Sequence, residues 1–359
     1  MAVLEKQENS LQEPRLPDSR VNVFWRKFTD FFSLPIVKEW LPPILGMAIV
    51  ILSISFSSKY SFPVYSREGE ALPAPVLRNI GTGKAQVAWE AGSPHLVSLR
   101  GVPVPELSAS AYLVRLLGNG QIFLKRREWE AMAPASLTKI LTALIAEEKL
   151  SPDEVLTISL DAKRFGSMQG GKVSAVPSGE SLRRDDMIRL ALVISANDAA
   201  LALAEAVGKK EGAPTFSNAL AHFVKLMNQK AWQIGLRYSQ FQNPTGLDEE
   251  LHRMNAHDVA RLIEYAWYTH PRLFEISREH LVTITSPSGT AYSLSNTNEL
   301  LGEFPAILGS KTGYLEAGNE TLAMVYPIRP DRAAVIVLLG SKDRFADGRK
   351  LIRWLEESF

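Results

Sequence analysis

Segments typical of β-strands occur early and late in this chain, and segments typical of helices lie between them. Residues 111–117 and 122–125 flank Gly118-Asn119-Gly120-Gln121, which predicts a β-hairpin. A second pair of strand-like segments, 321–328 and 333–339, is also joined by a short turn. This order favours an antiparallel sheet covered by helices, so we predict an α+β fold.

Apolar residues recur with helical spacing through the middle of the chain and again at its end. Gly208 and Gly235 are predicted to end two of the helices. The glycine-rich segment 165–179 is predicted to be a loop. The helices are expected over 185–194, 199–207, 220–231, 255–267 and 343–357.

An uncharged stretch from Trp40 to Ser58 is close to the length of about 20 residues that crosses a bilayer. Arg26, Lys27 and Lys38 come shortly before this stretch, and basic residues on this side favour a cytoplasmic N-terminus. We expect an uncleaved membrane anchor at 36–58, with the polar tail 1–35 in the cytoplasm and the rest of the chain extracytoplasmic. The alternative is a buried helix of a soluble protein.

Six prolines lie between residues 59 and 107. Such a segment is typical of a spacer, although Gln86–Trp89 could form a short strand. The compact domain is therefore expected at 108–359.

The composition excludes several classes of function. The formal net charge is only +1, so the chain lacks the excess of basic residues that is typical of nucleic-acid-binding proteins. The absence of cysteine rules out disulfides, thiolate catalysis and cysteine-bound metal. No His-Glu-x-x-His zinc motif occurs either, and we predict neither a metal nor an organic cofactor.

The segment Pro134-Ala135-Ser136-Leu137-Thr138-Lys139 leads into an apolar run with helical spacing. This spacing places Ser136 at the start of a helix and Lys139 one turn further on, on the same side. If burial lowers the pKa of the amine, the neutral amine can take the hydroxyl proton and activate a nucleophile. The alternative is that Ser136 is an ordinary N-cap.

Two further short motifs can contribute to a site. Ser195-Ala196-Asn197 lies at a break between two predicted helices, where a hydroxyl and an amide can face a cleft. Alternatively, Asn197 or Asp198 caps the second helix. Lys311-Thr312-Gly313 offers a cation, a hydroxyl and a residue without a side chain, beside which an extended peptide ending in a carboxylate could lie.

In this order, the three motifs resemble the signature of penicillin-binding proteins and serine β-lactamases. Between about Ser108 and Leu339 the chain is most similar to the serine-type D-alanyl-D-alanine carboxypeptidases, the low-molecular-mass penicillin-binding proteins. The middle motif has alanine where that family often has glycine. The resemblance implies that an all-helical subdomain accompanies the antiparallel sheet. It also extends to Asn197-Asp198-Ala199-Ala200, Asn243-Pro244-Thr245-Gly246-Leu247 and Asn296-Thr297-Asn298.

The resemblance implies hydrolysis of peptidoglycan stem peptides through an acyl-serine intermediate, with β-lactams as covalent inhibitors. Ser136 would be the nucleophile, Lys139 its base, and Ser195 the proton relay to the leaving amine. Asn197 would hold the substrate amide. Lys311, Thr312 and Gly313 would bind the peptide, the first two at its terminal carboxylate. The backbone N–H groups of Ser136 and Tyr314 would form the oxyanion hole.

Three alternatives remain open at this point. The chain could cut cross-links as a DD-endopeptidase, because both reactions present similar carbonyls. A class A-like β-lactamase would share the motifs, but residues 225–245 contain none of the glutamates expected for deacylation. The third alternative is a module that binds wall peptide or penicillin without catalytic turnover. A Ser-His-Asp hydrolase is disfavoured because no Gly-x-Ser-x-Gly motif occurs.

Overall fold

The computed structural model describes residues 75–78, 86–89, 101–315 and 319–359. The chain divides into two units, Met1–Val64 and Tyr65–Phe359, and all described residues belong to the second. The predicted tail and membrane anchor lie outside the described residues, so both stay predictions. Within the described ranges, no helix combines the length and the apolar character needed to cross a bilayer.

Two short strands pair within the predicted spacer. Strand β1 (Pro75–Arg78) runs antiparallel to β2 (Gln86–Trp89), with Pro75 opposite Trp89. The strand expected at Gln86–Trp89 is confirmed, whereas its partner was not predicted. The boundaries proposed at residues 59 and 108 stay predictions.

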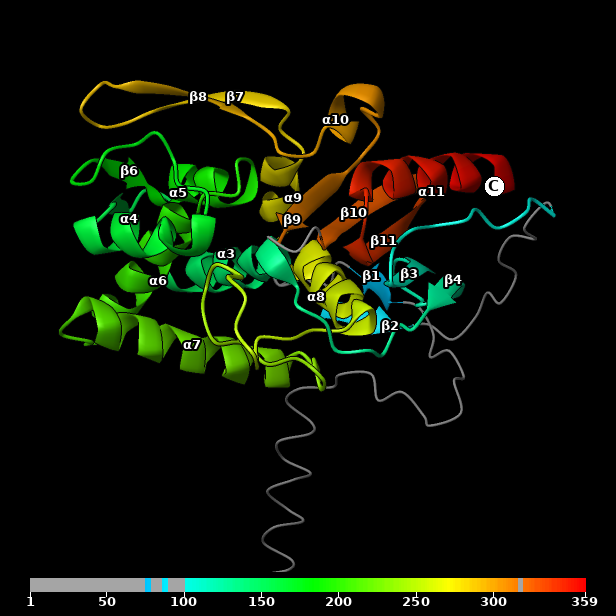
Figure 1. The fold of residues 1–359 in the computed structure, drawn as a ribbon, viewed down its shortest axis with the longest axis horizontal. Helices are drawn as coiled ribbons and strands as arrows, with labels where there is room; N and C mark the ends of the chain where they lie inside the picture. Colours follow the sequence, from blue (N-terminus) through cyan, green and yellow to red (C-terminus); the bar gives the residue numbers. More distant parts are fainter. Residues whose placement is uncertain (1–74, 79–85, 90–100, 316–318) are drawn as a thin grey trace, which may run out of the picture. The chain divides into compact units, whose positions relative to one another are not determined.

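A five-stranded antiparallel sheet connects the two ends of the domain (Figure 1). Both predicted hairpins, β3–β4 and β10–β11, are confirmed. Strand β3 of the first hairpin pairs with β11 of the second, which joins the two hairpins into one sheet. Strand β9 lies at one edge and β4 at the other. In sheet order the strands are β4 (Ile122–Arg126), β3 (Ala111–Leu116), β11 (Arg332–Ser341), β10 (Glu320–Arg329) and β9 (Gly309–Tyr314).

The sheet buries both of its faces, because successive side chains of a strand point to opposite sides. On β11, Val335 and Val337 belong to the core on one face, and Ile336 and Leu338 to the core on the other. Helix α8 (Ala256–Thr269) packs on the first face, and α11 (Arg344–Ser358) on the second (Figure 1). The strand therefore reads as a continuous apolar run.

Helix α3 (Thr138–Lys149) is the centre of the helical region. Every residue from Thr138 to Ala146 is buried, because helices contact α3 on several sides. The all-helical subdomain thus stands beside the sheet, with α3 between them (Figure 1). Its other helices are α4 (Leu160–Gly166), α5 (Arg184–Leu192), α6 (Asn197–Lys210) and α7 (Phe216–Gln233).

Short elements complete the described chain. The turn η1 (Ala135–Leu137) precedes α3 directly. Two further antiparallel strand pairs lie outside the main sheet: β5 with β6, and the hairpin of β7 with β8. The remaining bounds are β5 (Val155–Thr157), η2 (Met168–Gly170), β6 (Ser181–Arg183), α9 (Arg272–Ser277), β7 (Leu281–Thr285), β8 (Ala291–Ser295) and α10 (Leu300–Glu303).

Two local predictions were wrong. Gly208 does not end its helix, because α6 continues to Lys210. The glycine is needed instead for packing: a Cβ at this position would lie 2.5 Å from the Cα of Ala219 on α7. Part of the segment expected to be a loop, 165–179, belongs to α4, whose N-cap Ser159 accepts a hydrogen bond from the N–H of Ala162.

We expect Gly208→Ala to destabilise the protein by about 1–3 kcal/mol, because the overpacking at Ala219 outweighs the helix propensity that alanine gains. Gly302→Ala is the matched control, since its Cβ would meet only the His280 ring at 3.5 Å, an ordinary contact. The control should change stability by no more than about 1 kcal/mol. Urea unfolding measures both variants, and equal stabilities would contradict the packing argument.

Candidate active site

Ser136 lies in η1, immediately before α3, and its side chain is half-buried. It is not the N-cap of α3, because that position belongs to Leu137 and no side chain caps it. The preceding residue, Ala135, has a φ of +50°, a left-handed conformation that alanine rarely adopts. Such strain persists only where surrounding contacts hold it, and it is common at functional sites.

The Lys139 amine reaches back one turn to the serine. Its Nζ donates hydrogen bonds to Ser136 Oγ at 2.7 Å and to the backbone oxygen of Thr245 at 2.7 Å. Lys139 is completely buried, and this burial lowers its pKa to about 7, although the charge of Asp198 opposes the shift. Near neutral pH, neutral and charged amine therefore coexist beside the hydroxyl.

The Ser195 hydroxyl lies in the turn between α5 and α6. Ser195 has a φ of +62°, and its Oγ accepts a hydrogen bond from Lys311 Nζ at 2.8 Å. Among the described residues, only Arg127, Ala135 and Ser195 combine a positive φ with a side chain, and two of these belong to the predicted site or adjoin it. The turn therefore presents the hydroxyl toward β9.

The capping alternative for Asn197 and Asp198 was wrong. The N-cap of α6 is Ala196, without a side-chain cap. Asn197 Nδ2 donates to the oxygen of Gly166 at 3.1 Å, so it links α6 to the end of α4. The buried Asp198 carboxylate accepts hydrogen bonds from Lys163 Nζ at 2.7 Å and from Ser174 Oγ at 2.7 Å. Both side chains thus fix the segment that follows α4 against the Ser195 turn.

Strand β9 brings the third motif to the first two. Lys311 is buried and also donates to the backbone oxygen of Thr312 at 2.8 Å. Burial holds the pKa of Lys311 well below its ordinary value, and the nearby charges of Lys139, Arg344 and Lys172 lower it further. Thr312 Oγ1 lies 2.6 Å from Thr297 Oγ1, within hydrogen-bond distance.

Gly313 is required where β9 passes the nucleophile candidate. A Cβ at this position would lie 2.9 Å from the backbone nitrogen of Ser136 and 2.8 Å from the Cβ of Ala135. The next residue, Tyr314, has a side chain that is 60% exposed. The eight predicted site residues therefore belong to η1, the start of α3, the α5–α6 turn, the first position of α6 or β9. Their catalytic and binding roles stay predictions.

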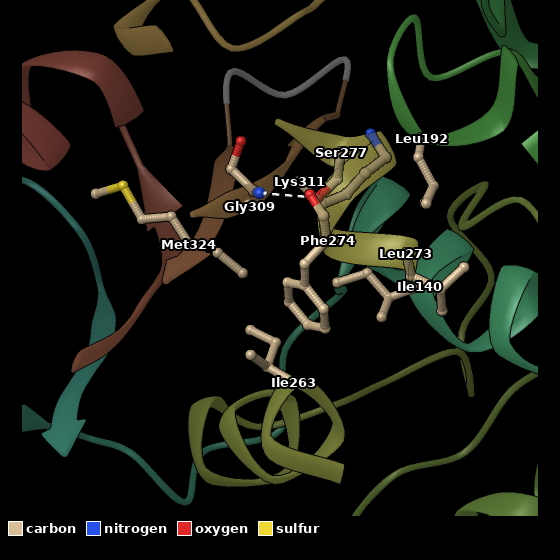
Figure 2. Close-up of a pocket in the computed structure, with 11 residues that line it drawn as sticks. Ile140, Leu192, Ile263, Leu273, Phe274, Ser277, Gly309, Lys311 and Met324 are labelled. Carbon is tan, nitrogen blue, oxygen red and sulfur yellow. Dashed lines mark hydrogen bonds between the residues drawn. The ribbon is translucent and has the colours of Figure 1, made fainter. Parts of the chain in front are cut away.

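An apolar floor supports β9 from inside the domain (Figure 2). The cavity there has a volume of about 20 Å³, room for one water molecule and far too little for a peptide. Figure 2 shows Lys311 at this cavity, with Phe274, Ile263 and Ile140 among the side chains that line it. A larger hollow beside the β10–β11 turn, lined by Pro330 among others, contains none of the predicted site residues.

A chain of hydrogen bonds that the sequence did not predict fixes the carbonyl before Ser136. The backbone N–H of Gln242 donates to His252 Nδ1 at 3.2 Å, which leaves His252 Nε2 as the protonated nitrogen. Nε2–H then donates to Thr138 Oγ1 at 2.8 Å, and this hydroxyl donates to the oxygen of Ala135 at 2.9 Å. Gly246, with a φ of +85°, packs against the same carbonyl.

Arg344 was also missed by the sequence analysis. Its Nη1 donates to the oxygen of Gly313 at 3.3 Å and forms an ion pair with Glu320 at 3.2 Å. It follows the N-cap of α11 directly, so its position beside β9 depends on how α11 packs on the sheet. No group of three or more histidines, aspartates or glutamates that could hold a metal occurs among the described residues.

Comparison with known proteins identifies relatives of this site and fold. Residues 99–342 match the family described as D-alanyl-D-alanine carboxypeptidase, peptidase S11. The D-alanyl-D-alanine carboxypeptidase DacF of Bacillus subtilis is 29% identical over 241 residues, covering 65% of this chain but only 58% of DacF. A D-alanyl-D-alanine endopeptidase of Pseudomonas aeruginosa is 34% identical over 264 residues, covering 71% of this chain and 80% of the endopeptidase.

Solved structures show the same fold. The Streptomyces K15 DD-transpeptidase superposes with a TM-score of 0.65 at 21% identity, covering 71% of this chain and 99% of the transpeptidase. The D-alanyl-D-alanine carboxypeptidase DacD of Francisella tularensis gives a TM-score of 0.62 at 25% identity, covering 74% of this chain and 73% of DacD. The predicted α+β architecture is thereby confirmed.

We expect stability to fall between about pH 6.5 and pH 4 because of His252. Burial lowers the pKa of this imidazole from 6.5 to about 4, so the unfolded chain takes up the proton first as the pH falls. The loss amounts to at most about 3 kcal/mol. His252→Gln should flatten the decline measured by chemical unfolding at a series of pH values.

The exposed His280 provides the control for this experiment. His280→Gln should leave the pH dependence of stability as it is in the unchanged protein. A decline of the same steepness in the His252 variant would show that this imidazole does not titrate in the way its burial requires.

Proposed function

This chain belongs to the D-alanyl-D-alanine carboxypeptidase family, peptidase S11, and we propose that it is a serine DD-peptidase acting on peptidoglycan stem peptides. It removes the terminal D-alanine through an acyl-serine intermediate and is acylated by β-lactams. The observation that carries this proposal is the buried Lys139 amine, 2.7 Å from Ser136 Oγ, with a pKa of about 7. A neutral amine at this distance can accept the hydroxyl proton as the oxygen attacks.

The proposed reaction has two halves. In the first, Ser136 Oγ attacks the carbonyl carbon between the two D-alanines while Lys139 Nζ takes the hydroxyl proton. The N–H groups of Ser136 and Tyr314 stabilise the oxyanion. The C–N bond then breaks as Ser195 relays the proton from Lys139 Nζ to the departing amine of D-alanine, and the acyl group stays on Ser136. In the second half, water attacks this ester, which releases the shortened peptide and restores the hydroxyl.

The substrate in this proposal lies along β9. Lys311 and Thr312 bind its terminal carboxylate, and Gly313 leaves room for the backbone next to Ser136. Asn197 holds the amide on the acyl side of the bond that is cut. The bond from Lys311 Nζ to Ser195 Oγ supports this assignment, because it places the cation next to the proposed proton relay.

Cleavage of peptide cross-links is the second candidate. The relative from Pseudomonas aeruginosa is named an endopeptidase and shares 34% of its residues with this chain over 80% of its own length. A class A-like β-lactamase and a module without turnover rank lower. Rapid release of the penicilloyl group would favour the β-lactamase, and an acylated protein that cleaves no peptide would favour the binding module.

We propose, further, that residues 36–58 anchor the protein in a bacterial cell membrane with the peptidase domain on the extracytoplasmic side. The uncharged stretch from Trp40 to Ser58 and the basic residues before it support this proposal. Peptidoglycan also lies outside that membrane, so the proposed substrate is accessible from there.

We expect Ser136→Ala to abolish covalent labelling by a fluorescent penicillin and to reduce D-alanine release by a factor on the order of 10⁴ or more, because the ester cannot form. Mass spectrometry of a stem peptide and of a cross-linked dimer measures both activities and separates carboxypeptidase from endopeptidase. Ser217→Ala, on the exposed side of α7, is the control and should label normally. Undiminished labelling of the Ser136 variant would remove this serine from the reaction.

The rate of acylation should rise with pH and reach half of its maximum near pH 7, because only the neutral form of Lys139 accepts the proton. Stopped-flow labelling with the same penicillin measures the profile. Lys139→Arg should lower the rate at least about 100-fold across the range, since a guanidinium stays protonated. The exposed Lys225→Arg serves as control. A flat profile in the unchanged protein would disprove the role of Lys139.

A further inference from the structure

An exposed pair of aromatic side chains lies on the surface of the domain, and the proposed reaction does not use it. The Trp129 side chain is 51% exposed, and that of Tyr238 is 62% exposed. Their ring centroids are 5.6 Å apart and the ring planes meet at 69°, which is an edge-to-face contact. Tryptophan and tyrosine are enriched at binding surfaces, because they offer a large contact area with few rotatable bonds.

The protein holds both rings in place. The Trp129 ring stacks on the His257 ring, with centroids 4.0 Å apart and planes at 23°. The N–H of His257 also donates to the backbone oxygen of Glu128 at 3.1 Å. The N–H of Tyr238 donates to Asp258 Oδ2 at 2.9 Å. Both aromatic residues are therefore fixed to the first turn of α8, and a ligand would not have to order them.

The backbone just before Trp129 is strained. Arg127 has a φ of +46°, and the other two described residues that combine a positive φ with a side chain, Ala135 and Ser195, adjoin or belong to the predicted active site. The N–H of Glu130 donates to the Arg127 oxygen at 3.0 Å, which closes the turn that carries Trp129. Strained backbone of this kind clusters at functional sites, so the turn points to a second function of this surface.

The segment that follows this turn crosses the end of the main sheet. It leaves β4 and passes β11, where a Cβ at Gly340 would lie 2.7 Å from Met132 Cε. It then passes β10, where Thr321 Oγ1 donates to the oxygen of Pro134 at 3.2 Å. Ser136 follows beside β9, the strand at the other edge. One stretch of chain therefore connects the exposed tryptophan with the nucleophile candidate.

Trp129 and Ser136 therefore lie at opposite edges of the same end of the sheet. Four strand spacings separate β4 from β9, or about 19 Å. An extended peptide of about five or six residues spans this distance. In the proposed reaction the terminal carboxylate lies at Lys311 and Thr312, so the acyl part of the substrate continues along β9 past Gly313, toward this end of the sheet.

We propose that Trp129 and Tyr238 form a sugar-binding platform, which takes the glycan strand to which the stem peptide is attached. This inference rests on the proposed function. A pyranose ring presents a face of C–H groups, and these weakly positive hydrogens are attracted to the negative face of an aromatic ring. The guanidinium of Arg127 beside the platform already pairs with Glu130, which favours an uncharged ligand. The preferred substrate class is a stem peptide still joined to its sugar chain.

Chitohexaose, a soluble chain of β-linked N-acetylglucosamine, tests the platform without any peptide. The full-length protein should bind it in a ligand-observed NMR titration, and Trp129→Ala should weaken the affinity at least about tenfold, because the stacking surface is lost. Trp129→Phe should stay within about threefold of the unchanged protein, since it keeps an aromatic face. Tyr238→Ala, an independent variant, should weaken binding at least about threefold.

Leu160→Ala is the matched control for the binding measurement. It removes a 62% exposed apolar side chain at the first position of α4, in the helical subdomain, and should leave the affinity for chitohexaose as it is. Urea unfolding shows whether each variant is folded. No binding by the unchanged protein, or equal affinities in the unchanged protein and the folded Trp129 and Tyr238 variants, would overturn the proposal.

Activity on two substrates connects the platform with the reaction. One is the stem peptide attached to soluble glycan chains, and the other is the same peptide freed from the sugar by an amidase. The unchanged protein should prefer the attached peptide about tenfold in kcat/KM, mainly through a lower KM, because the glycan adds binding energy away from the reacting bond. Trp129→Ala should reduce this preference to within about twofold, and Leu160→Ala should keep it.

The two measurements separate this proposal from the proposed function. If the unchanged protein cleaves neither substrate, the proposed function is wrong, and the platform is decided by the chitohexaose affinities alone. An exposed aromatic pair can also contact another protein. If Trp129→Ala alters the oligomeric state in sedimentation experiments and leaves chitohexaose binding unaltered, the surface is a protein interface and the sugar-binding proposal is overturned.

Discussion

The burial of one amine is the constraint on which the rest of this structure depends. Lys139 is on a helix that several other helices surround, so its charge is withdrawn from water. Among the residues that the structure describes, only the Ser136 hydroxyl and the Thr245 carbonyl accept its hydrogen bonds, and neither is an anion. Two neutral acceptors compensate for the lost hydration only in part, which is why the pKa falls. The architecture therefore sets the chemistry of this lysine.

Local patterns were sufficient to predict much of the fold and one part of the site. Helical periodicity and short turns identified the hairpins and the long helices, and the spacing of Ser136 and Lys139 along a helix was enough to bring them together. The errors came from contacts between distant segments. In the sequence Gly208 resembles a residue that ends a helix. In the structure, its missing side chain allows α7 to pack closely against α6. The low helix propensity of glycine did not end this helix, because tertiary packing outweighs intrinsic propensity at such positions.

The remaining contacts of the site join residues that are far apart in the sequence. Thr245 meets Lys139 across 106 positions, and His252 meets Thr138 across 114. Asp198 looks like a helix cap, but its carboxylate binds Lys163 and Ser174 instead. The family resemblance includes the segments that contain Asp198 and Thr245, but helical spacing and turn patterns do not predict which residues they contact. Their partners are defined only after the chain has folded.

The hydrogen bond from Thr138 to the oxygen of Ala135 has a consequence for the neighbouring residue. That carbonyl and the N–H of Ser136 belong to one planar peptide group, so holding the oxygen also sets the direction of the hydrogen. His252 holds the Thr138 hydroxyl, and the backbone at Gly246 packs against the same carbonyl, so both restrict the movement of this peptide group. In the proposed reaction, the oxyanion would therefore meet an N–H dipole whose direction the fold has already set.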